Sequence, residues 1–270
     1  MSPGACLGYL CDVAPHTPWG TLRAEIMRPQ VHVWLARPDD PGHDARLEGY
    51  RGLLTDEERA RGERFRFARH RRQFWVTRAL VRTSLSQYFD VPPRDWRFEP
   101  DVHGRPRVVS PCEVSPLSFN LSHTDGLIAC GCTWGATLGC DVEDLQRRLE
   151  THKVARRFFA EPEVAALDAG PQDLRPRRFL EFWTLKEAYL KARGTGLRLP
   201  LGDFAFELSE RIGGLDHALP ERIRIAFHGI DDDPARWRFT LHDPTPHHLL
   251  ALALNTPIPI PIHLHHWTGD

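Results

Sequence analysis

The sequence predicts an α+β fold built from two similar halves, and three observations favour it. Along the 270 residues, helical patterns followed by short antiparallel strands occur twice, although no repeat of fixed period is present. The composition, 41% hydrophobic and 26% charged, is typical of a globular chain with a packed core. An Asp-Gly pair at 125–126 separates two apolar runs and indicates a tight hairpin. The halves are expected to meet near residues 135–145.

The first elements follow from local patterns. Residues 1–29 contain Pro3, Pro15, Pro18 and Pro29 without periodicity, so we expect an extension that lacks regular structure. A strand is predicted at 31–36, where apolar and bulky polar residues alternate. A loop rich in Pro, Asp and Gly follows at 37–44.

Two helices come next. Thr55 and Glu58 have the spacing of a capping box, which predicts a helix from there to about Phe67. A second helix is predicted at about 71–88 from apolar residues at helical spacing. Their arginines form either a solvated face with acidic partners or a site for an anion such as phosphate. They are Arg59, Arg61, Arg64, Arg66, Arg69, Arg71, Arg72, Arg78 and Arg82.

Short strands complete the first half and begin the second. A strand at 96–99 leads into a turn at 101–106. Three consecutive strands, at 117–122, 127–133 and 137–143, are expected to form an antiparallel meander.

The rest of the chain repeats the order of helices and strands. Helices are predicted at about 150–159, 162–167 and 176–193, the last ended by Gly194 and Gly196. Strands are predicted at 204–208, 222–228, 237–243 and 248–254. The tail, 257–270, contains three prolines and His263, His265 and His266; a metal site is conceivable, and an exposed tail is favoured.

Composition argues against several classes of protein. With 35 Lys and Arg against 36 Asp and Glu, the net charge is -1, so we expect no nucleic-acid partner. No run of 18 apolar residues is present, and the first residues lack the features of a secretory signal. The six cysteines form no C-x-x-C pair and are expected to be reduced. We therefore expect a cytoplasmic protein without a membrane partner.

Asp141 and Glu143 are the first candidate functional residues. In a strand they lie two apart and point to the same face, where two carboxylates repel each other unless a cation lies between them. Mg²⁺ usually takes one or two carboxylates together with substrate phosphates. The pair is therefore a candidate magnesium site, and an acidic turn at a strand end is the alternative.

The helix at 176–193 carries the second candidate set. Lys186, Glu187 and Lys191 fall within an arc of about 140°, where a carboxylate can hold a metal and ammonium groups can hold phosphate. An ordinary amphipathic helix with a Glu187–Lys191 pair is the alternative. Ser122 and His123, at the hairpin, are either hydrogen-bond donors to a phosphate or turn-stabilising residues. Walker A, G-x-G-x-x-G and H-E-x-x-H motifs are absent from the sequence.

Taken in order, these motifs resemble the 4′-phosphopantetheinyl transferases of the single-chain, surfactin-synthetase-activating class. That class modifies carrier proteins of nonribosomal peptide, polyketide and related biosynthesis. The matching stretches are GRP at 104–106, FNLSH at 119–123, GCDVE at 139–143 and WTLKEAYLK at 183–191. Segments 54–82 and 157–163 are also similar, so the resemblance covers roughly residues 50–210.

The resemblance implies a pseudo-twofold α+β fold with coenzyme A in a cleft between the halves. It implies that Asp141, Glu143 and Glu187 hold Mg²⁺ and that Lys186 and Lys191 neutralise pyrophosphate. Residues that match coenzyme A contacts are Arg61, Arg105, Ser122 and His123.

The sequence departs from the family pattern in three places. Arg105 replaces a lysine, Cys140 replaces a β-branched residue, and Glu58 stands where some relatives carry a basic residue. The last departure puts a phosphate contact at that position in doubt, although Arg61 is nearby.

The implied reaction is that of a holo-[acyl-carrier-protein] synthase type enzyme. The phosphopantetheine arm moves from coenzyme A to a serine of an apo acyl or peptidyl carrier protein, and adenosine 3′,5′-bisphosphate leaves. Glu187, Lys191 and Glu143 are the expected catalytic residues, with Glu187, Glu143 or a metal-bound water as the base.

We expect residues 30–138 to provide the coenzyme A phosphate side and residues 139–256 the Mg²⁺ and catalytic residues, in a monomer. A non-catalytic coenzyme-A-binding or carrier-docking module is the alternative. Another Mg²⁺-dependent phosphotransferase is a third reading, but it would need a phosphate loop that the sequence lacks.

Overall fold

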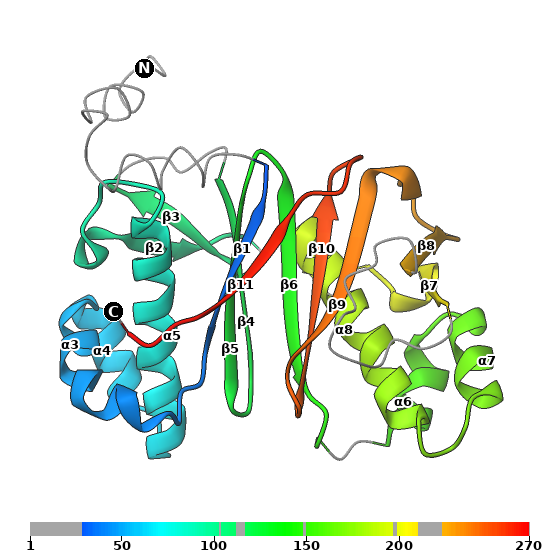
Figure 1. Ribbon diagram of the computed structural model, residues 1–270, viewed down its shortest axis with the longest axis horizontal. Helices are drawn as coiled ribbons and strands as arrows, with labels where there is room; N and C mark the ends of the chain where they lie inside the picture. Colours follow the sequence, from blue (N-terminus) through cyan, green and yellow to red (C-terminus); the bar gives the residue numbers. More distant parts are fainter. Residues whose placement is uncertain are drawn as a thin grey trace. The chain divides into compact units, whose positions relative to one another are not determined.

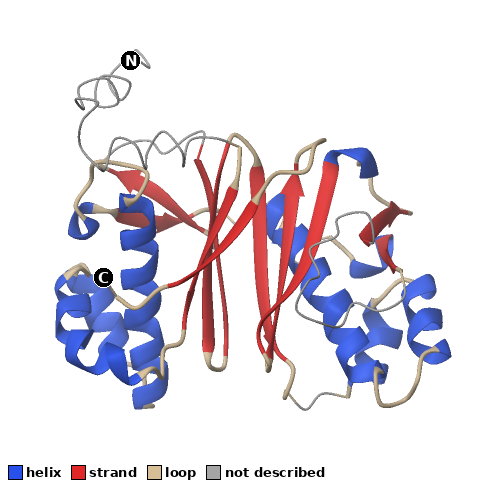
Figure 2. Ribbon diagram, in the orientation of Figure 1, coloured by secondary structure: helices blue, strands red, loops and turns tan. Residues whose placement is uncertain are grey.

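A computed structural model describes residues 29–102, 104–111, 117–147, 150–196, 199–209 and 223–269. The chain divides into two compact units (Figure 1). Unit 1 comprises Met1–Ser118, Cys132–Gly135 and Ile260–Asp270, and unit 2 comprises Phe119–Gly131 and Ala136–Pro259. Both units contain helices and small sheets, which confirms the predicted α+β class (Figure 2). The extension at 1–28 lies outside the described residues, as do Cys6, Cys11 and Cys112.

Unit 1 contains the predicted strand and helix pair. Thr55 caps α4 as expected, because its side chain accepts from the Glu58 N–H while the Glu58 carboxylate accepts from the Thr55 N–H. A short 3-10 helix, η1, begins within the predicted loop at 37–44, and helix α3 follows in a stretch for which no element was predicted. The elements are β1 (Val31–Ala36), η1 (Pro41–Arg46), α3 (Leu47–Gly52), α4 (Asp56–Glu63), α5 (Ala68–Ser86), η2 (Pro93–Asp95), β2 (Arg97–Pro100), β3 (Pro106–Ser110) and β11 (Ile262–His266).

The C-terminal segment corrects the interpretation of 257–270 as an exposed tail. Its residues Ile262–His266 form β11, which pairs in parallel with β1. On this pair, the His32 ring stacks on the rings of His263 and His265, with centroids 5.1 Å apart in both cases. The sequence did not predict this strand for two reasons. Its histidines give it no clear apolar alternation, and its partner strand is more than two hundred residues away.

Unit 2 contains two of the sheets and the strands that carry the candidate site residues. Strands β4 (Leu117–Thr124) and β5 (Leu127–Trp134) follow the predicted Asp-Gly turn, in which Gly126 has φ 78°. The expected meander is wrong, since the third strand joins a separate sheet of order β6-β10-β9 while β4 and β5 belong to the sheet β11-β1-β5-β4. The remaining elements are β6 (Thr137–Asp144), α6 (Thr151–Phe158), α7 (Glu161–Ala169), α8 (Arg175–Arg193), η4 (Leu201–Asp203), β7 (Phe204–Leu208), β8 (Ile223–Phe227), η6 (Pro234–Arg236), β9 (Trp237–Thr245) and β10 (His248–Asn255).

Helix α8 packs along β6 and β10, and this contact positions the site (Figure 1). The approach is close because Gly139 lacks a side chain: a Cβ there would lie 1.9 Å from the Ala188 carbonyl oxygen. The helix ends where predicted, at Gly194 in the left-handed conformation with φ 71°. Buried aromatic residues of the helix, such as Phe182 and Tyr189, belong to the hydrophobic core of the same unit.

Candidate functional site

Asp141 lies at the centre of the candidate site, in the middle of β6. Its carboxylate is buried, and Oδ1 accepts from Ser122 Oγ at 2.8 Å and from Lys191 Nζ at 2.7 Å. The other oxygen, Oδ2, is buried without a hydrogen-bond partner in the structure. An unpartnered buried carboxylate oxygen is costly, so this position calls for a cation or a donor.

Lys191 reaches the carboxylate from α8. Its ammonium also donates to Ser122 Oγ at 2.9 Å and to the Cys140 carbonyl oxygen at 3.0 Å. Burial alone would lower the pKa of Lys191, but the charge of Asp141 and its hydrogen bond raise the pKa above the ordinary value. The predicted cation is thus fully charged and rests beside the predicted metal ligand.

Glu143 and Glu187 supply the other two carboxylates. Burial, followed by the charge of Asp141, raises the pKa of Glu143; hydrogen bonds from Arg147 and the Trp183 indole oppose this shift. Burial and the same aspartate raise the pKa of Glu187 to about 7, with a smaller contribution from Glu143. The charge of Asp141 therefore disfavours the charged forms of both Glu143 and Glu187, as expected for carboxylates that share one site.

This donor set fits a hard divalent cation. Two carboxylates at alternate positions of β6 and one from α8 repel each other, and Asp141 has a buried oxygen without a donor. As the side chains stand, no three His, Cys, Asp or Glu residues in the described ranges are arranged to hold a metal ion. The lysine ammonium holds the Asp141 oxygen instead, at 2.7 Å.

His123 and Ser122, adjacent on β4, differ in their surroundings. His123 is exposed, but part of its ring is covered by the protein, and this partial burial together with the Lys191 charge lowers its pKa, while Asp141 acts in the opposite direction. Ser122 is buried and its hydroxyl contacts Asp141, Lys191 and the backbone of β6. His123 therefore stays available to a ligand, whereas Ser122 is engaged by the protein.

Lys186 requires a correction. We predicted that it would neutralise pyrophosphate, but its side chain is fully buried on the other side of α8. Its ammonium forms an ion pair with Glu163 at 2.8 Å and donates to the carbonyl oxygens of Leu201 and Phe204. Three acceptors satisfy its three N–H groups, so Lys186 joins α8 to α7 and β7 in the core.

Arg61 and Arg105 belong to unit 1 and have partners there. Arg61, on α4, is exposed, with its guanidinium 5.8 Å from the Phe74 ring centroid. Arg105 lies in the turn between β2 and β3, where its Nε is 3.6 Å from Asp101 Oδ2. Glu58, the departure from the family pattern, forms a buried 2.6 Å ion pair with Arg82. Its charge is thus already balanced within unit 1.

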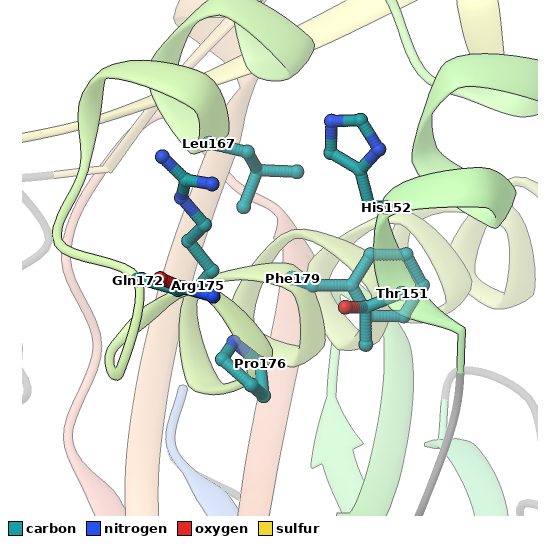
Figure 3. A pocket seen from close by; sticks show the side chains of 7 residues that line it. All are labelled: Thr151, His152, Leu167, Gln172, Arg175, Pro176 and Phe179. Atoms are coloured by element: carbon teal, nitrogen blue, oxygen red, sulfur yellow. The ribbon is translucent and has the colours of Figure 1, made fainter.

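A separate pocket of about 300 Å³ lies among α6, α7 and the start of α8 (Figure 3). Phe179, which lines it, is eight positions before Glu187, or about 12 Å along the helix. None of the predicted site residues lines this pocket. The lining residues are Thr151, His152, Leu167, Gln172, Arg175, Pro176 and Phe179.

Comparison with known proteins decides the family. Residues 137–252 match the family model described as 4′-phosphopantetheinyl transferase superfamily, and residues 43–133 match 4′-phosphopantetheinyl transferase, N-terminal. The 4′-phosphopantetheinyl transferase HetI of Nostoc sp. is 34% identical over 172 residues, which cover 64% of this chain and 72% of HetI. The chain belongs to the 4′-phosphopantetheinyl transferase family.

Two further relatives agree with this assignment to the 4′-phosphopantetheinyl transferases. The Synechocystis sp. protein slr0495 is 30% identical over 216 residues, 79% of this chain and 80% of that one. The transferase Sfp of Bacillus subtilis is 26% identical over 172 residues, 64% of this chain and 74% of Sfp. As a member of the family, the chain is an enzyme that transfers phosphopantetheine to carrier proteins.

Sequence reasoning missed three residues that hold a predicted site residue or its strand. Asn120 holds the β6 backbone, Trp183 donates to Glu143, and Glu163 neutralises Lys186. All three stand inside the motif stretches, but their partners are on other elements. The sequence indicated only that they lie next to candidate residues. It did not indicate which way their side chains point or which element they contact.

Proposed function

We propose that this chain uses Mg²⁺ to transfer the phosphopantetheine arm of coenzyme A to a serine hydroxyl of an apo acyl or peptidyl carrier protein. The observation that carries the proposal is the arrangement of three mutually repelling carboxylates with Lys191 on the central one. A pyrophosphate substrate with a divalent cation would relieve this repulsion. Nonribosomal peptide and polyketide carriers are the expected partners, and the protein is expected to act as a cytoplasmic monomer.

The proposed step is a displacement at phosphorus. The serine oxygen bonds to the phosphorus that carries the pantetheine group, and the bond from that phosphorus to the bridging oxygen breaks. The electron pair leaves with adenosine 3′,5′-bisphosphate, and the serine proton passes to a base. Asp141, Glu143 and Glu187 would hold Mg²⁺, which when bound neutralises the phosphate oxygens and aligns the pyrophosphate.

The protein's own residues have distinct proposed roles in this step. Glu187, whose pKa burial and Asp141 raise to about 7 before a cation is bound, is the candidate to accept the serine proton, directly or through water. Lys191 would stabilise the negative charge on the leaving group. His123 would contact a coenzyme A phosphate from its exposed position on β4. Glu143 is the alternative base.

The coenzyme A phosphates are proposed to bind residues of the first half of the chain, 30–138. Arg61 and Arg105 are the candidate contacts for the 3′-phosphate, because both keep a charged group near the surface of unit 1. The catalytic residues named above all lie in 139–256.

The carrier protein is proposed to dock on the basic side of α6. Exposed Lys153, Arg156 and Arg157 lie there, and Phe158 beside them is 45% exposed. A basic surface that includes an exposed apolar side chain complements an acidic carrier protein. The helices at 55–82 are the second candidate surface. Charge reversal of Arg157 should raise the KM for the carrier and leave the KM for coenzyme A unchanged, if α6 is the surface; Arg156 is less suitable because it pairs with Asp168 at 2.8 Å.

The direct test is intact-mass spectrometry of apo carrier proteins incubated with this protein, coenzyme A and Mg²⁺. A mass gain of one phosphopantetheine arm, abolished by a chelator, is the expected result. Peptidyl, polyketide and fatty-acid carriers are tested in parallel. If none gains mass while coenzyme A still binds, the non-catalytic binding module is the better description.

A further inference from the structure

The β6 strand has an edge that another strand does not cover. It is the outer strand of the β6-β10-β9 sheet, with β10 on one side only. Alternate residues direct their N–H groups to opposite edges, so the free edge exposes donors at every second residue. A buried N–H donor left without an acceptor on this edge would be costly and would loosen the strand that carries Asp141 and Glu143.

Two side chains of β4 satisfy this edge. The Cys140 N–H donates to Asn120 Oδ1 at 3.1 Å, and the Val142 N–H donates to Ser122 Oγ at 3.2 Å. Asn120 and Ser122 are two apart on β4, so both side chains point to the same face. The spacing of the acceptors therefore equals the spacing of the donors, and β4 holds β6 through side chains.

The Ser122 hydroxyl is fully used in this arrangement. It donates to Asp141 Oδ1 at 2.8 Å and accepts from the Val142 N–H and from Lys191 Nζ. A hydroxyl has one hydrogen to donate and two lone pairs to accept with. Ser122 thus cannot donate to a phosphate without giving up Asp141, and at 6% exposure it is poorly placed to meet one.

The orientation of Asp141 depends on these bonds. One oxygen is held by Ser122 and Lys191, which directs the carboxylate so that Oδ2 carries no protein hydrogen bond. We infer that Asn120 and Ser122 are positioning residues: they fix the edge of β6 and orient Asp141 so that its second oxygen is kept for the divalent cation. This inference rests on the proposed function and replaces the expected phosphate contact at Ser122.

The experiment compares hydroxyl-deletion variants of the full chain. Ser122→Ala removes all three bonds, while Ser122→Thr keeps the hydroxyl and should restore them. Thr240→Val is the matched control, because Thr240 is a buried hydroxyl of the same sheet, on β9, bonded to His242. If Ser122→Ala fails to fold, Ser122→Cys keeps the volume with a weak donor and carries the same comparison.

The first readout is Mn²⁺ binding by electron paramagnetic resonance, in the presence of coenzyme A and without a carrier. Ser122→Ala should weaken Mn²⁺ binding about tenfold or more, the usual effect of losing a group that orients a metal ligand. Ser122→Thr and Thr240→Val should bind Mn²⁺ as the wild type does. Unchanged Mn²⁺ affinity in Ser122→Ala and Ser122→Cys would overturn the inference.

The second readout separates positioning from phosphate contact. If Ser122 only positions Asp141, Ser122→Ala changes the KM values for coenzyme A and dephospho-coenzyme A by the same factor. A loss confined to coenzyme A would overturn the inference in favour of a 3′-phosphate contact. Weak Mn²⁺ binding in Ser122→Ala with no carrier modification by the wild type would uphold positioning and refute the proposed transfer. Absence of Mn²⁺ binding by the wild type would refute both.

Discussion

The buried pair of Glu163 and Lys186 leads to a quantitative prediction about stability. Both side chains are 0% exposed and their charged atoms are 2.8 Å apart. Glu163 also accepts from the N–H groups of Ala160 and Phe206, and these hydrogen bonds favour its charged form. Burial raises the pKa of Glu163 and lowers that of Lys186, and each partner opposes the shift of the other.

Lys186→Met would remove the cation and leave the carboxylate buried. Breaking a buried pair on one side costs about 3–5 kcal/mol, because the remaining charge has no partner. Two carbonyl oxygens, of Leu201 and Phe204, also lose their donor, so the upper end of this range applies. We expect the midpoint of thermal unfolding to fall by about 10–20 °C, at roughly 2–4 °C per kcal/mol for a protein of this size.

Chemical denaturation of the wild type, Lys186→Met and the double variant Lys186→Met/Glu163→Gln measures this effect. Removing the second charge should recover part of the lost stability, since no ion is then buried alone. The reasoning is refuted if Lys186→Met unfolds within 1 kcal/mol of the wild type, a difference of ordinary surface size. An unchanged stability with a raised KM for coenzyme A would return Lys186 to the phosphate role that the sequence predicted.

Four other predictions follow. Gly139→Ala should destabilise the protein by about 3 kcal/mol or more in urea unfolding, because the new Cβ would meet helix backbone at 1.9 Å; a smaller cost would mean that α8 shifts freely. Asp141→Ala should lower the transfer rate on the order of a hundredfold at low Mg²⁺, and full activity there would exclude a metal role. Arg61→Ala and Arg105→Ala should raise the KM for coenzyme A far more than that for dephospho-coenzyme A, and equal effects would argue against 3′-phosphate contacts. Burial and the neighbouring histidines lower the pKa of His32 from 6.5 to about 4. The stability that the neutral ring contributes is therefore complete above pH 6.5 and is lost, by on the order of 1–3 kcal/mol, as the pH falls towards 4. His32→Phe should flatten this part of the profile of stability against pH.

Short-range chemistry made much of the fold predictable. The capping box at Thr55, the Asp-Gly hairpin and the glycine that ends α8 depend on neighbours within a few residues. The placement of Asp141 and Glu143 on one face is of the same kind, because side chains alternate along a strand whichever strand it pairs with. These features survive in any tertiary context that leaves the element intact, so the sequence by itself determined them.

Helix geometry explains why the prediction succeeded for Lys191 and failed for Lys186. Residues four apart lie about 40° apart around a helix, so Glu187 and Lys191 share the face that packs on β6. Lys186 is about 100° from its neighbour Glu187 and turns into the core beside Glu163. The predicted arc of about 140° included both the face towards β6 and the face towards Glu163. Only the packing of the helix decided which of these faces the site.

Long-range pairing decided the rest. The β6 strand pairs with β10 instead of continuing a meander, β11 returns to β1, and Asn120 and Ser122 reach β6 through side chains. A strand pattern reports which side chains share a face, but it does not specify the partner strand. By itself the sequence determined most of the helices and strands, the carboxylate set and the family resemblance, but not α3, β3 or β11. Tertiary contacts determined which polar groups meet, because hydrogen bonds and burial act between distant segments.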